Sequence, residues 1–517
     1  MRWLTKGGLA TVICGLAFSQ ALAQCPDRPS PGTVVQDPMS LSSQRGVLST
    51  KFVMERSVDG AGYTHYCYRY NRGSTVVEAP TLRLNPGDRL ELEVVNRIKD
   101  DDATKMNMAE ESPGACGDSG AMTVDSTNVH FHGLNVPPKC HQDDVINTLI
   151  QPGSAGFQYN MQIPATERPG LYWYHPHVHG FTEFQVNGGA AGALIVEGME
   201  KVRPEVAGLA ERVFVIRQQY LVPWIPGPYQ LTLNYQVAQA VGGSKPIIQM
   251  KPGEKQFWRV ANATLQDFLP LQVQVDGKPQ PLEVIALDGY PLAKTRKQDT
   301  ILIPPAGRAE FIVQAPASGN TIILYTGSYS TGPTGNPDIQ QTLAGIQLTN
   351  KTAASQMPGA PGSGNDELAS SLAEQPVTAT RKLFFSEEFG GTNGPIQFYI
   401  TVDGQKQKVF EGNEKPVITT KVGAVEDWIV ENRALETHAF HIHQIHFQVL
   451  EVDGKPVAHQ DMRDTIEIPF WNGQGPFPSV KLRMDFRDPT TAGVFLFHCH
   501  ILLHEDLGMM HKILVEP

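Results

Sequence analysis

The sequence predicts an all-β fold built from three tandem sandwich or barrel domains. One observation is a pattern of short runs in which apolar and polar residues alternate, as in residues 90–94, which read LELEV. A period of two is typical of strands, and the 48 Gly and 39 Pro of the chain separate the runs. The other observation is an internal repeat one domain long. Together they favour β-domains over helical ones.

The internal repeat consists of two alternating runs that are joined by a glycine turn and end in Val-x-Asn. Its turn glycines, Gly87, Gly253 and Gly423, lie 166 and 170 residues apart, a separation typical of one domain. The three copies cover residues 82–97, 247–263 and 415–433. The predicted divisions are a signal peptide over 1–23, a first domain over 24–200, a second over 201–350, a linker over 351–378 and a third domain over 379–517.

The start of the chain has the pattern of a secretory signal peptide. Arg2 and Lys6 supply positive charge, residues 9–18 are apolar, and residues 21–23 read ALA, a small-x-small cleavage site. No run in the chain is long and apolar enough to predict a membrane span. We expect a secreted protein, with the periplasm favoured and an extracellular location as the alternative.

The six cysteines have different predicted roles. Cys14 belongs to the signal peptide, and Cys499 lies in a histidine motif described below. The other four are an even number in an oxidising compartment, which indicates disulfides. Four cysteines allow three pairings. Among these we favour Cys25 with Cys67 and Cys116 with Cys140.

The histidines are concentrated in four short clusters. Twelve of the 16 lie there, with two clusters in the first predicted domain and two in the third. Alternate residues of a strand point to one face, so a His-x-His pair presents two imidazoles to the same side. Imidazole binds zinc, copper, iron and nickel, so the clusters predict metal sites. They are His130 and His132; His175, His177 and His179; His438, His441, His443 and His446; and His498, His500 and His504.

The last cluster indicates which metal is bound. Cys499, His504 and Met509 offer a thiolate, an imidazole and a thioether close together in the chain. With a second histidine, for which His438 is the candidate, they form the ligand set of a blue-copper electron-transfer site. Zinc would favour a closed tetrahedral set and has no use for a long thioether bond. The sequence therefore predicts copper.

The residues on either side of Cys499 indicate a route for electrons. His498 and His500 flank it and, on a strand, would point to the opposite face. They can therefore bind coppers other than the one at Cys499. The Cys–His peptide would connect a site that accepts single electrons to a cluster that collects them for dioxygen.

Four segments carry the clusters: HFHG (130–133), WYHPH (173–177), HAFHIH (438–443) and HCHILLHEDLGM (498–509). Together they resemble the four copper motifs of three-domain multicopper oxidases, and the resemblance covers essentially the whole chain after the signal peptide. It implies three cupredoxin-like domains, each a Greek-key β-sandwich or barrel. The second domain would carry no copper ligand, and a trinuclear copper cluster would lie between the first and third.

The resemblance also implies four copper ions and their ligands. A type 1 copper would be bound by His438, Cys499 and His504, with Met509 as its axial ligand. A type 2 copper would be bound by His130 and His441, one type 3 copper by His132, His175 and His500, and the other by His177, His443 and His498. Met510 competes for the axial place, but the spacing from His504 favours Met509. His179 and His446 are not expected to be ligands, and they would either support the ligands or be structural; His511 is also not an expected ligand.

The resemblance also implies acidic residues for proton delivery, and the third motif departs from the family pattern at two positions. Family members have an acidic residue after the first motif and another after the last, and here these correspond to Asp143 or Asp144 and to Glu505. In the third motif Ala439 stands where the family often has proline. Gln444 stands where it often has glycine. Neither of these two residues is an implied ligand.

The implied activity is oxidation of a phenol or aromatic amine near His504, coupled to the four-electron reduction of dioxygen to water. A metal ion, Cu(I), Fe(II) or Mn(II), is the alternative donor. The copper-efflux subtype is disfavoured because only Met462 and Met484 lie between the third and fourth motifs. A copper nitrite reductase would lack the type 3 pair. A structural family member would not need every ligand, and a copper-storage or carrier protein would not need the His-Cys-His connection. The net charge of −11 argues against a nucleic-acid partner, and the number of chains in the assembly is left open.

Overall fold

The computed structural model describes residues 24–59, 62–99, 116–219, 230–238, 243–338, 340–349, 372–390 and 396–517. Within these residues the chain consists mainly of β-strands, so the predicted all-β class is confirmed. The strands form three units, each with two large sheets. The predicted signal peptide and most of the predicted linker lie outside the described residues.

The first unit contains β1 (Ser40–Ser42), β2 (Val47–Val58), β3 (Thr64–Arg72), β4 (Thr75–Glu78), β5 (Thr81–Leu84), β6 (Arg89–Asn96), β7 (Cys116–Gly117), β8 (His130–His132), β9 (Thr148–Leu149), β10 (Phe157–Gln162), β11 (Gly170–His175), α1 (Thr182–Gly188) and β12 (Gly192–Val196). One sheet has the strand order β1-β5-β12-β11-β8, and the other has the order β10-β6-β2-β3-β4. Strands β7 and β9 pair separately.

The second unit follows the short helices α2 (Met199–Val202) and η2 (Pro204–Val206). Its strands are β13 (Ala210–Gln219), β14 (Gln230–Leu233), β15 (Gln236–Val237), β16 (Ile247–Met250), β17 (Lys255–Ala263), β18 (Leu269–Val275), β19 (Lys278–Pro279), β20 (Leu282–Leu287), β21 (Tyr290–Gln298), β22 (Ile301–Ile303), β23 (Arg308–Gln314), β24 (Ile322–Thr326) and β25 (Gln341–Leu348). The sheet orders are β15-β14-β13-β17-β23-β20-β21 and β16-β25-β24-β18-β19, with β22 added at β18.

The third unit contains β26 (Ala379–Phe389), β27 (Ile396–Val402), β28 (Ile418–Lys421), β29 (Ala424–Asn432), β30 (His438–Ile442), β31 (Phe447–Val452), β32 (Lys455–Pro456), β33 (Met462–Arg463), β34 (Thr465–Ile468), β35 (Ser479–Phe486), η3 (Pro489–Thr491), β36 (Gly493–Cys499), α4 (Leu502–Asp506) and β37 (Met510–Glu516). One sheet runs β27-β26-β29-β35-β31-β32, with β33 added at β31, and the other runs β28-β37-β36-β30-β34.

The alternating run over residues 90–94 lies in strand β6, and every second side chain of the run points into the core. Leu90, Leu92 and Val94 in β6 are fully buried, whereas Glu91 and Glu93 between them stay partly exposed. The buried side chains of this unit form one cluster with apolar residues of both sheets. The second and third units have equivalent clusters. Burial of alternate faces therefore holds each pair of sheets together.

The repeat seen in the sequence has the same structural role in each unit. The turn glycines Gly87, Gly253 and Gly423 have φ angles of 86°, 75° and 94°, in the left-handed region where a Cβ atom would be strained. Each Val-x-Asn then lies at or next to the end of a strand, with a buried asparagine. In the third unit, Asn432 donates to the backbone oxygens of Glu436 at 2.7 Å and Ile468 at 3.1 Å. These bonds anchor the loop that leads into β30.

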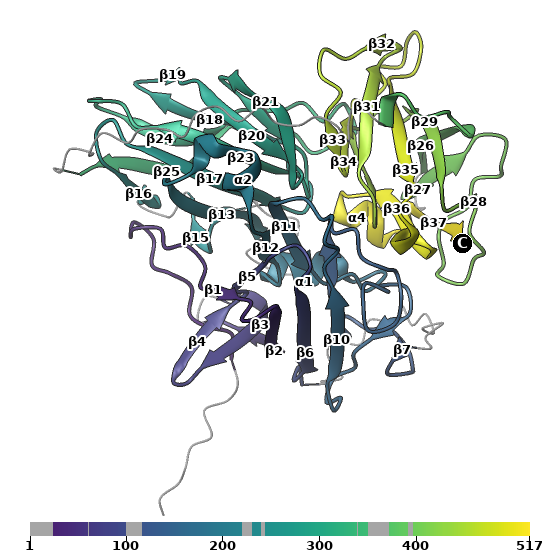
Figure 1. Cartoon of the computed structure of the whole chain (residues 1–517), viewed down its shortest axis with the longest axis horizontal. Helices are drawn as coiled ribbons and strands as arrows, with labels where there is room; N and C mark the ends of the chain where they lie inside the picture. The colour runs from purple at the N-terminus through teal and green to yellow at the C-terminus, as the bar shows by residue number, and fades with distance from the viewer. Residues whose placement is uncertain are drawn as a thin grey trace, which may run out of the picture.

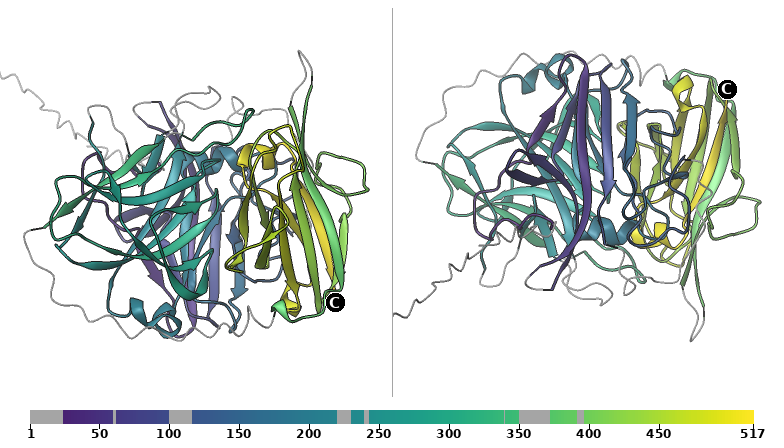
Figure 2. Two further views of the ribbon diagram at one scale, coloured as in Figure 1. Left: turned by 90° about the horizontal axis from the view of Figure 1, so that it is seen from above. Right: turned by 90° about the horizontal axis from the view of Figure 1, so that it is seen from below.

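The first and third units lie side by side. Figure 1 shows the first unit at the bottom, the second at the upper left and the third at the upper right, and both views of Figure 2 keep the first and third adjacent. Helix α1 contacts α4 across this interface. The Asp506 carboxylate accepts the backbone N–H groups of Thr182 at 2.9 Å and Glu183 at 2.8 Å, which satisfies free donors at the start of α1. In the described residues, no helix is both long and apolar enough to cross a membrane.

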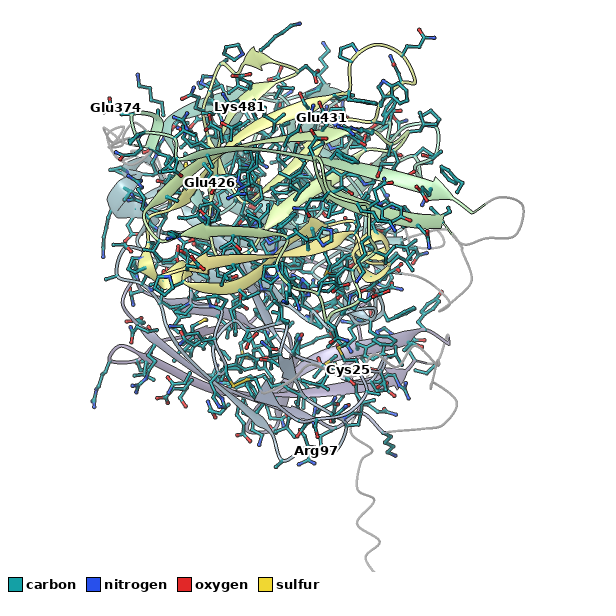
Figure 3. All side chains as sticks on the ribbon, turned by 90° about the vertical axis from the view of Figure 1, so that its right-hand side faces the viewer. Cys25, Arg97, Glu374, Glu426, Glu431 and Lys481 are labelled. Atoms are coloured by element: carbon teal, nitrogen blue, oxygen red, sulfur yellow. A yellow bond between two sulfur atoms is a disulfide. The ribbon has the colours of Figure 1, made fainter. Side chains whose placement is uncertain are left out.

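Both favoured disulfides are confirmed. Cys25 pairs with Cys67, and Cys116 pairs with Cys140. Figure 3 places Cys25 in the first unit, well below the third unit in that view. Among the described cysteines, Cys499 is the one without a disulfide partner, and it is buried. It is therefore available for the metal-binding role that the sequence predicts.

Candidate metal centres

Eight histidines meet where the first unit packs against the third. Each unit contributes four, and the exposed fraction of every one is 3% or less. They are His130, His132, His175 and His177 of the first unit and His441, His443, His498 and His500 of the third. A lone buried histidine can be satisfied by the core, but eight together need a common partner.

Strand pairing places these histidines in register. In the first unit β8 pairs with β11, so that His130 lies opposite His175. In the third unit β30 pairs with β36, so that His441 lies opposite His498. Because all four strands end at the interface, their imidazoles extend into the same space.

The rings interleave across the interface. His132 stacks on His441 with ring centroids 3.9 Å apart, and His130 stacks on His443 at 4.0 Å. Each stack therefore joins one ring of the first unit to one of the third. The cluster exists only because the two units pack together.

Backbone and carboxylate acceptors leave one nitrogen of several rings free. The Nδ1–H of His130 donates to Asp143 at 3.0 Å, and that of His175 donates to the Pro176 oxygen at 2.8 Å. The Nδ1–H of His441 donates to the backbone oxygen of Asp464 at 2.8 Å. In all three rings Nε2 is buried and has no hydrogen-bond partner in the described residues. Such fixed tautomers are typical of metal-binding histidines.

Burial also keeps these imidazoles neutral. It lowers the pKa of His132, His175 and His177 well below the usual value, and repulsion by the neighbouring histidines adds to the shift. Burial lowers the pKa of His498 to about 3. Neutral rings keep a lone pair for a metal, and unpaired buried nitrogens would be costly without one. The residues therefore fit copper.

The predicted ligand sets are brought together to different degrees. The ligating atoms of His177, His443 and His498 lie within 4.8 Å of one another, and so do those of His130, His132 and His175. His130 and His441 share a further group of this kind with His443. The ring of His500 lies 5.1 Å from that of His132 and 5.5 Å from that of His175. The group of His177, His443 and His498 coincides with one implied type 3 set, whereas the other two groups combine histidines from different implied sets.

A second metal-binding group lies in the third unit alone. The Cys499 sulfur is 3.5 Å from His438 Nδ1 and 3.8 Å from His504 Nδ1, and the two nitrogens are 3.3 Å apart. All three residues are buried, and burial raises the pKa of the Cys499 thiol. Because a buried thiol resists ionisation, a bound metal is needed to hold it as a thiolate.

The packing of the two methionines favours Met509 over Met510 as the axial ligand. Met509 is fully buried in the same apolar cluster as Cys499, and its backbone oxygen accepts the Cys499 N–H at 3.1 Å. Met510 instead packs with Val145 and Phe410 in a separate cluster. The strand geometry therefore turns Met510 away from the Cys499 site.

The two groups are directly connected. Cys499 belongs to one group, and His498 and His500 on either side belong to the other. The Nδ1–H of His498 also donates to the Cys499 backbone oxygen at 2.9 Å. A short path of covalent bonds and one hydrogen bond therefore joins the sites.

The two predicted acidic positions lie at the cluster. Asp143 contacts His130 and is buried, whereas Asp144 accepts from the side chain of Asn147, so the structure favours Asp143. Glu505 is fully buried, with one oxygen 3.3 Å from His498 Nδ1 and the other 3.5 Å from His177 Nε2. Burial, together with the nearby Asp506, raises the pKa of Glu505 well above the usual value.

Sequence reasoning missed a buried ion pair beside the cluster. Asp464 accepts from His132 Nε2 at 3.3 Å, and its carboxylate is paired with Arg308 of the second unit. Arg308 also donates to the backbone oxygens of Asp288 at 2.8 Å and Leu171 at 3.2 Å. It thereby contacts all three units. No motif marks Arg308 or Asp464, because their roles depend on packing between units.

Two carboxylates beside the Cys499 group were also missed. A Glu387 oxygen lies 3.3 Å from His438 Nε2, and a Glu436 oxygen lies 3.7 Å from His504 Nε2. Burial, together with the nearby Glu387, raises the pKa of Glu436 to about 8. Phe398 stacks on His504 with ring centroids 4.0 Å apart. Carboxyl and aromatic groups therefore surround the outer edges of both rings.

The extra histidines lie outside both groups. His446 Nε2 donates to the Asp288 backbone oxygen at 2.9 Å, and the ring of His179 packs against Phe410 at 5.1 Å. The ring of His511 lies 6.3 Å from that of Phe497. These contacts support structural roles.

Comparison with known proteins identifies the family. Three family models, each described as multicopper oxidase, match residues 122–201, 213–349 and 390–517. The chain is 24% identical to a multicopper oxidase of Staphylococcus aureus over 92% of its own length and 94% of that protein. The chain belongs to the multicopper oxidase family. It is therefore an oxidoreductase that uses dioxygen, and the family implies that it binds copper.

Further relatives carry different functional names. A laccase of Bacillus subtilis is 24% identical to this multicopper oxidase, with 68% of this chain and 71% of that protein covered. A solved multicopper oxidase from Campylobacter jejuni, described as a metallo-oxidase, has a TM-score of 0.70 and 23% identity, covering 95% of this chain and 96% of that one. The structural likeness confirms the predicted cupredoxin-like fold. The names leave two classes of donor.

Proposed function

We propose that this multicopper oxidase binds four copper ions and couples oxidation of a phenol or aromatic amine to reduction of dioxygen to water. The observation that carries this proposal is the pair of buried ligand groups joined at Cys499. His438, Cys499 and His504 would hold type 1 copper, with Met509 as axial ligand. The eight interface histidines would hold type 2 and type 3 copper. Bound copper supplies single-electron acceptance and the reduction of dioxygen.

The protein groups around the cluster would orient ligands and hold protons. Asp143 fixes the tautomer of His130, and Asp464 fixes those of His132 and His441. The Glu505 carboxyl lies beside His177 and His498, where water formation consumes protons, so we assign it to proton delivery. Exclusion of solvent by the buried rings would prevent loss of partly reduced oxygen species.

The surface near His504 supports an organic donor. Leu503 and Leu507 on either side of it are exposed to 44% and 37%, although large apolar side chains usually avoid solvent. An aromatic ring could pack on these leucines and on α4. The second candidate donor is a metal ion, Cu(I), Fe(II) or Mn(II). Glu387 and Glu436 favour the harder ions Fe(II) and Mn(II), because carboxylates bind hard cations and stabilise the more highly charged product.

Oxygen uptake with matched variants separates the two donors. We expect Leu503→Asn to raise the KM for a phenol severalfold, since the apolar contact is lost, and to leave Fe(II) turnover unchanged. The paired variant Glu387→Gln/Glu436→Gln replaces both carboxyl groups with amides of nearly the same shape. If the donor is a phenol, this variant keeps phenol turnover. A loss of Fe(II) or Cu(I) turnover by tenfold or more, with slow phenol turnover throughout, would assign the enzyme to the metallo-oxidases.

We also propose that residues 1–23 direct export and that the enzyme works in the periplasm or outside the cell. Two disulfides support this location, because disulfides persist in oxidising compartments.

A further inference from the structure

Gln444 stands at a position where the family often has glycine, and its backbone has a positive φ angle. It follows His443 at the end of β30 and has a φ angle of 58°, in the left-handed region that favours glycine. Its exposed fraction is 2%. A glutamine that adopts a strained conformation while buried requires a compensating interaction.

That interaction is with the carboxylate beside the cluster. Gln444 Nε2 donates to Asp143 Oδ2 at 2.6 Å. Oδ2 also accepts from His130 Nδ1 at 3.0 Å, while Oδ1 accepts the Phe131 N–H at 3.0 Å. Asp143 is thus held by its own unit through His130 and Phe131, and by the third unit through Gln444. The Gln444 contact is a link between units that glycine could not make.

The amide orientation follows from the carboxylate. An amide presents either N–H donors or an acceptor oxygen, and an ionised carboxylate only accepts, so it bonds to the N–H side of the amide. The Gln444 Oε1 atom is accordingly turned away, and it is buried with no hydrogen-bond partner in the described residues. Gln444 also lines a pocket of about 520 Å³ whose walls include Asn135, Tyr290 and Asp488 from the three units. Its side chain therefore stands between this pocket and Asp143.

We propose that Gln444 is a positioning residue for the type 2 copper site. By holding Asp143 it fixes the ring of His130, whose unpaired Nε2 faces the cluster. The strained backbone is maintained because the side chain makes this bond. The inference rests on the proposed function, since it assigns type 2 copper to His130 and His441.

The test compares two variants of the copper-loaded full chain by electron paramagnetic resonance and by chelator-driven copper loss. Gln444→Gly removes the bond and relieves the backbone, so the chain is expected to fold. Gln444→Glu keeps the shape and replaces the donor with an acceptor. Loss of an outer partner of a metal-binding histidine typically weakens metal binding by about 10- to 100-fold. Because Gln444 acts on His130 through Asp143, we expect both variants to show an altered type 2 signal and faster type 2 copper loss, up to about this extent.

The type 1 signal provides the internal control, because Gln444 contacts none of His438, Cys499 and His504. It should be unchanged in both variants. Type 2 signals and copper loss equal to wild type in both variants would overturn the inference while leaving the proposed function intact. A wild-type protein with full copper but no type 2 signal would instead overturn the proposed function, and the inference with it.

Discussion

Replacing Cys499 by serine is expected to reduce oxygen uptake with every donor to background. A serine hydroxyl is a poor copper ligand and forms no thiolate, so the group of His438, Cys499 and His504 loses its strongest ligand. The intense visible absorption of a thiolate–copper bond should disappear at the same time. Absorption spectroscopy and an oxygen electrode measure the two effects.

The same variant should leave the rest of the enzyme intact. Serine fits the space of the thiol and can hydrogen-bond to the nearby imidazoles, so we expect the stability of the copper-free chain to change by about 1 kcal/mol or less. The eight interface histidines are unaltered and should retain three coppers per chain. Continued oxygen uptake in Cys499→Ser at the wild-type rate would show that electrons do not enter through this site.

Replacing Asp464 by asparagine should have the largest effect on stability. Asp464 and Arg308 are both fully buried, and the change leaves the guanidinium with only the more distant Asp288 carboxylate, 3.8 Å away, as a counter-charge. Breaking a buried pair typically costs about 3–5 kcal/mol. Because the Asp464 carboxylate also accepts from His132, we expect copper to bind the cluster about 10- to 100-fold more weakly. Denaturant unfolding of the copper-free chain and copper analysis after dialysis measure these effects separately.

An exposed pair in the first unit gives the matched control. Lys51 and Glu93 lie 2.7 Å apart with side chains exposed to 50% and 37%. Glu93→Gln is expected to change stability by less than about 1 kcal/mol, as exposed pairs contribute little. Equal unfolding midpoints for Asp464→Asn and Glu93→Gln would contradict the role assigned to the pair between units.

The parts of the site that the sequence predicts are those governed by local spacing. Alternation along a strand is sufficient to place His130 with His132 and His441 with His443 on common faces. In the same way, the left-handed turn of the repeat requires a glycine such as Gly423. The neighbours of Cys499 follow the same rule. These features depend on a few consecutive residues, so a pattern reveals them.

The parts that were missed depend on how separate units pack. Arg308 lies in β23 of the second unit, and its ion pair with Asp464 forms only when that unit meets the third. Glu387 reaches His438 through the pairing of β26 with β29, which brings distant segments together. Asp143 and Asp144 could not be separated by spacing, because only the fold shows which carboxylate contacts His130. Gln444 was seen as a departure, but its bond to Asp143 crosses between units.

The ratio of donor oxidised to dioxygen consumed tests the central claim most directly. The copper-loaded enzyme would be supplied with a donor that loses one electron, and hydrogen peroxide would be assayed in the same sample. Electrons entering at Cys499 and collected at a closed cluster predict four donors oxidised per dioxygen, with no peroxide released. Two donors per dioxygen with equivalent peroxide would contradict the account, because the histidine cluster would then not complete the reduction to water.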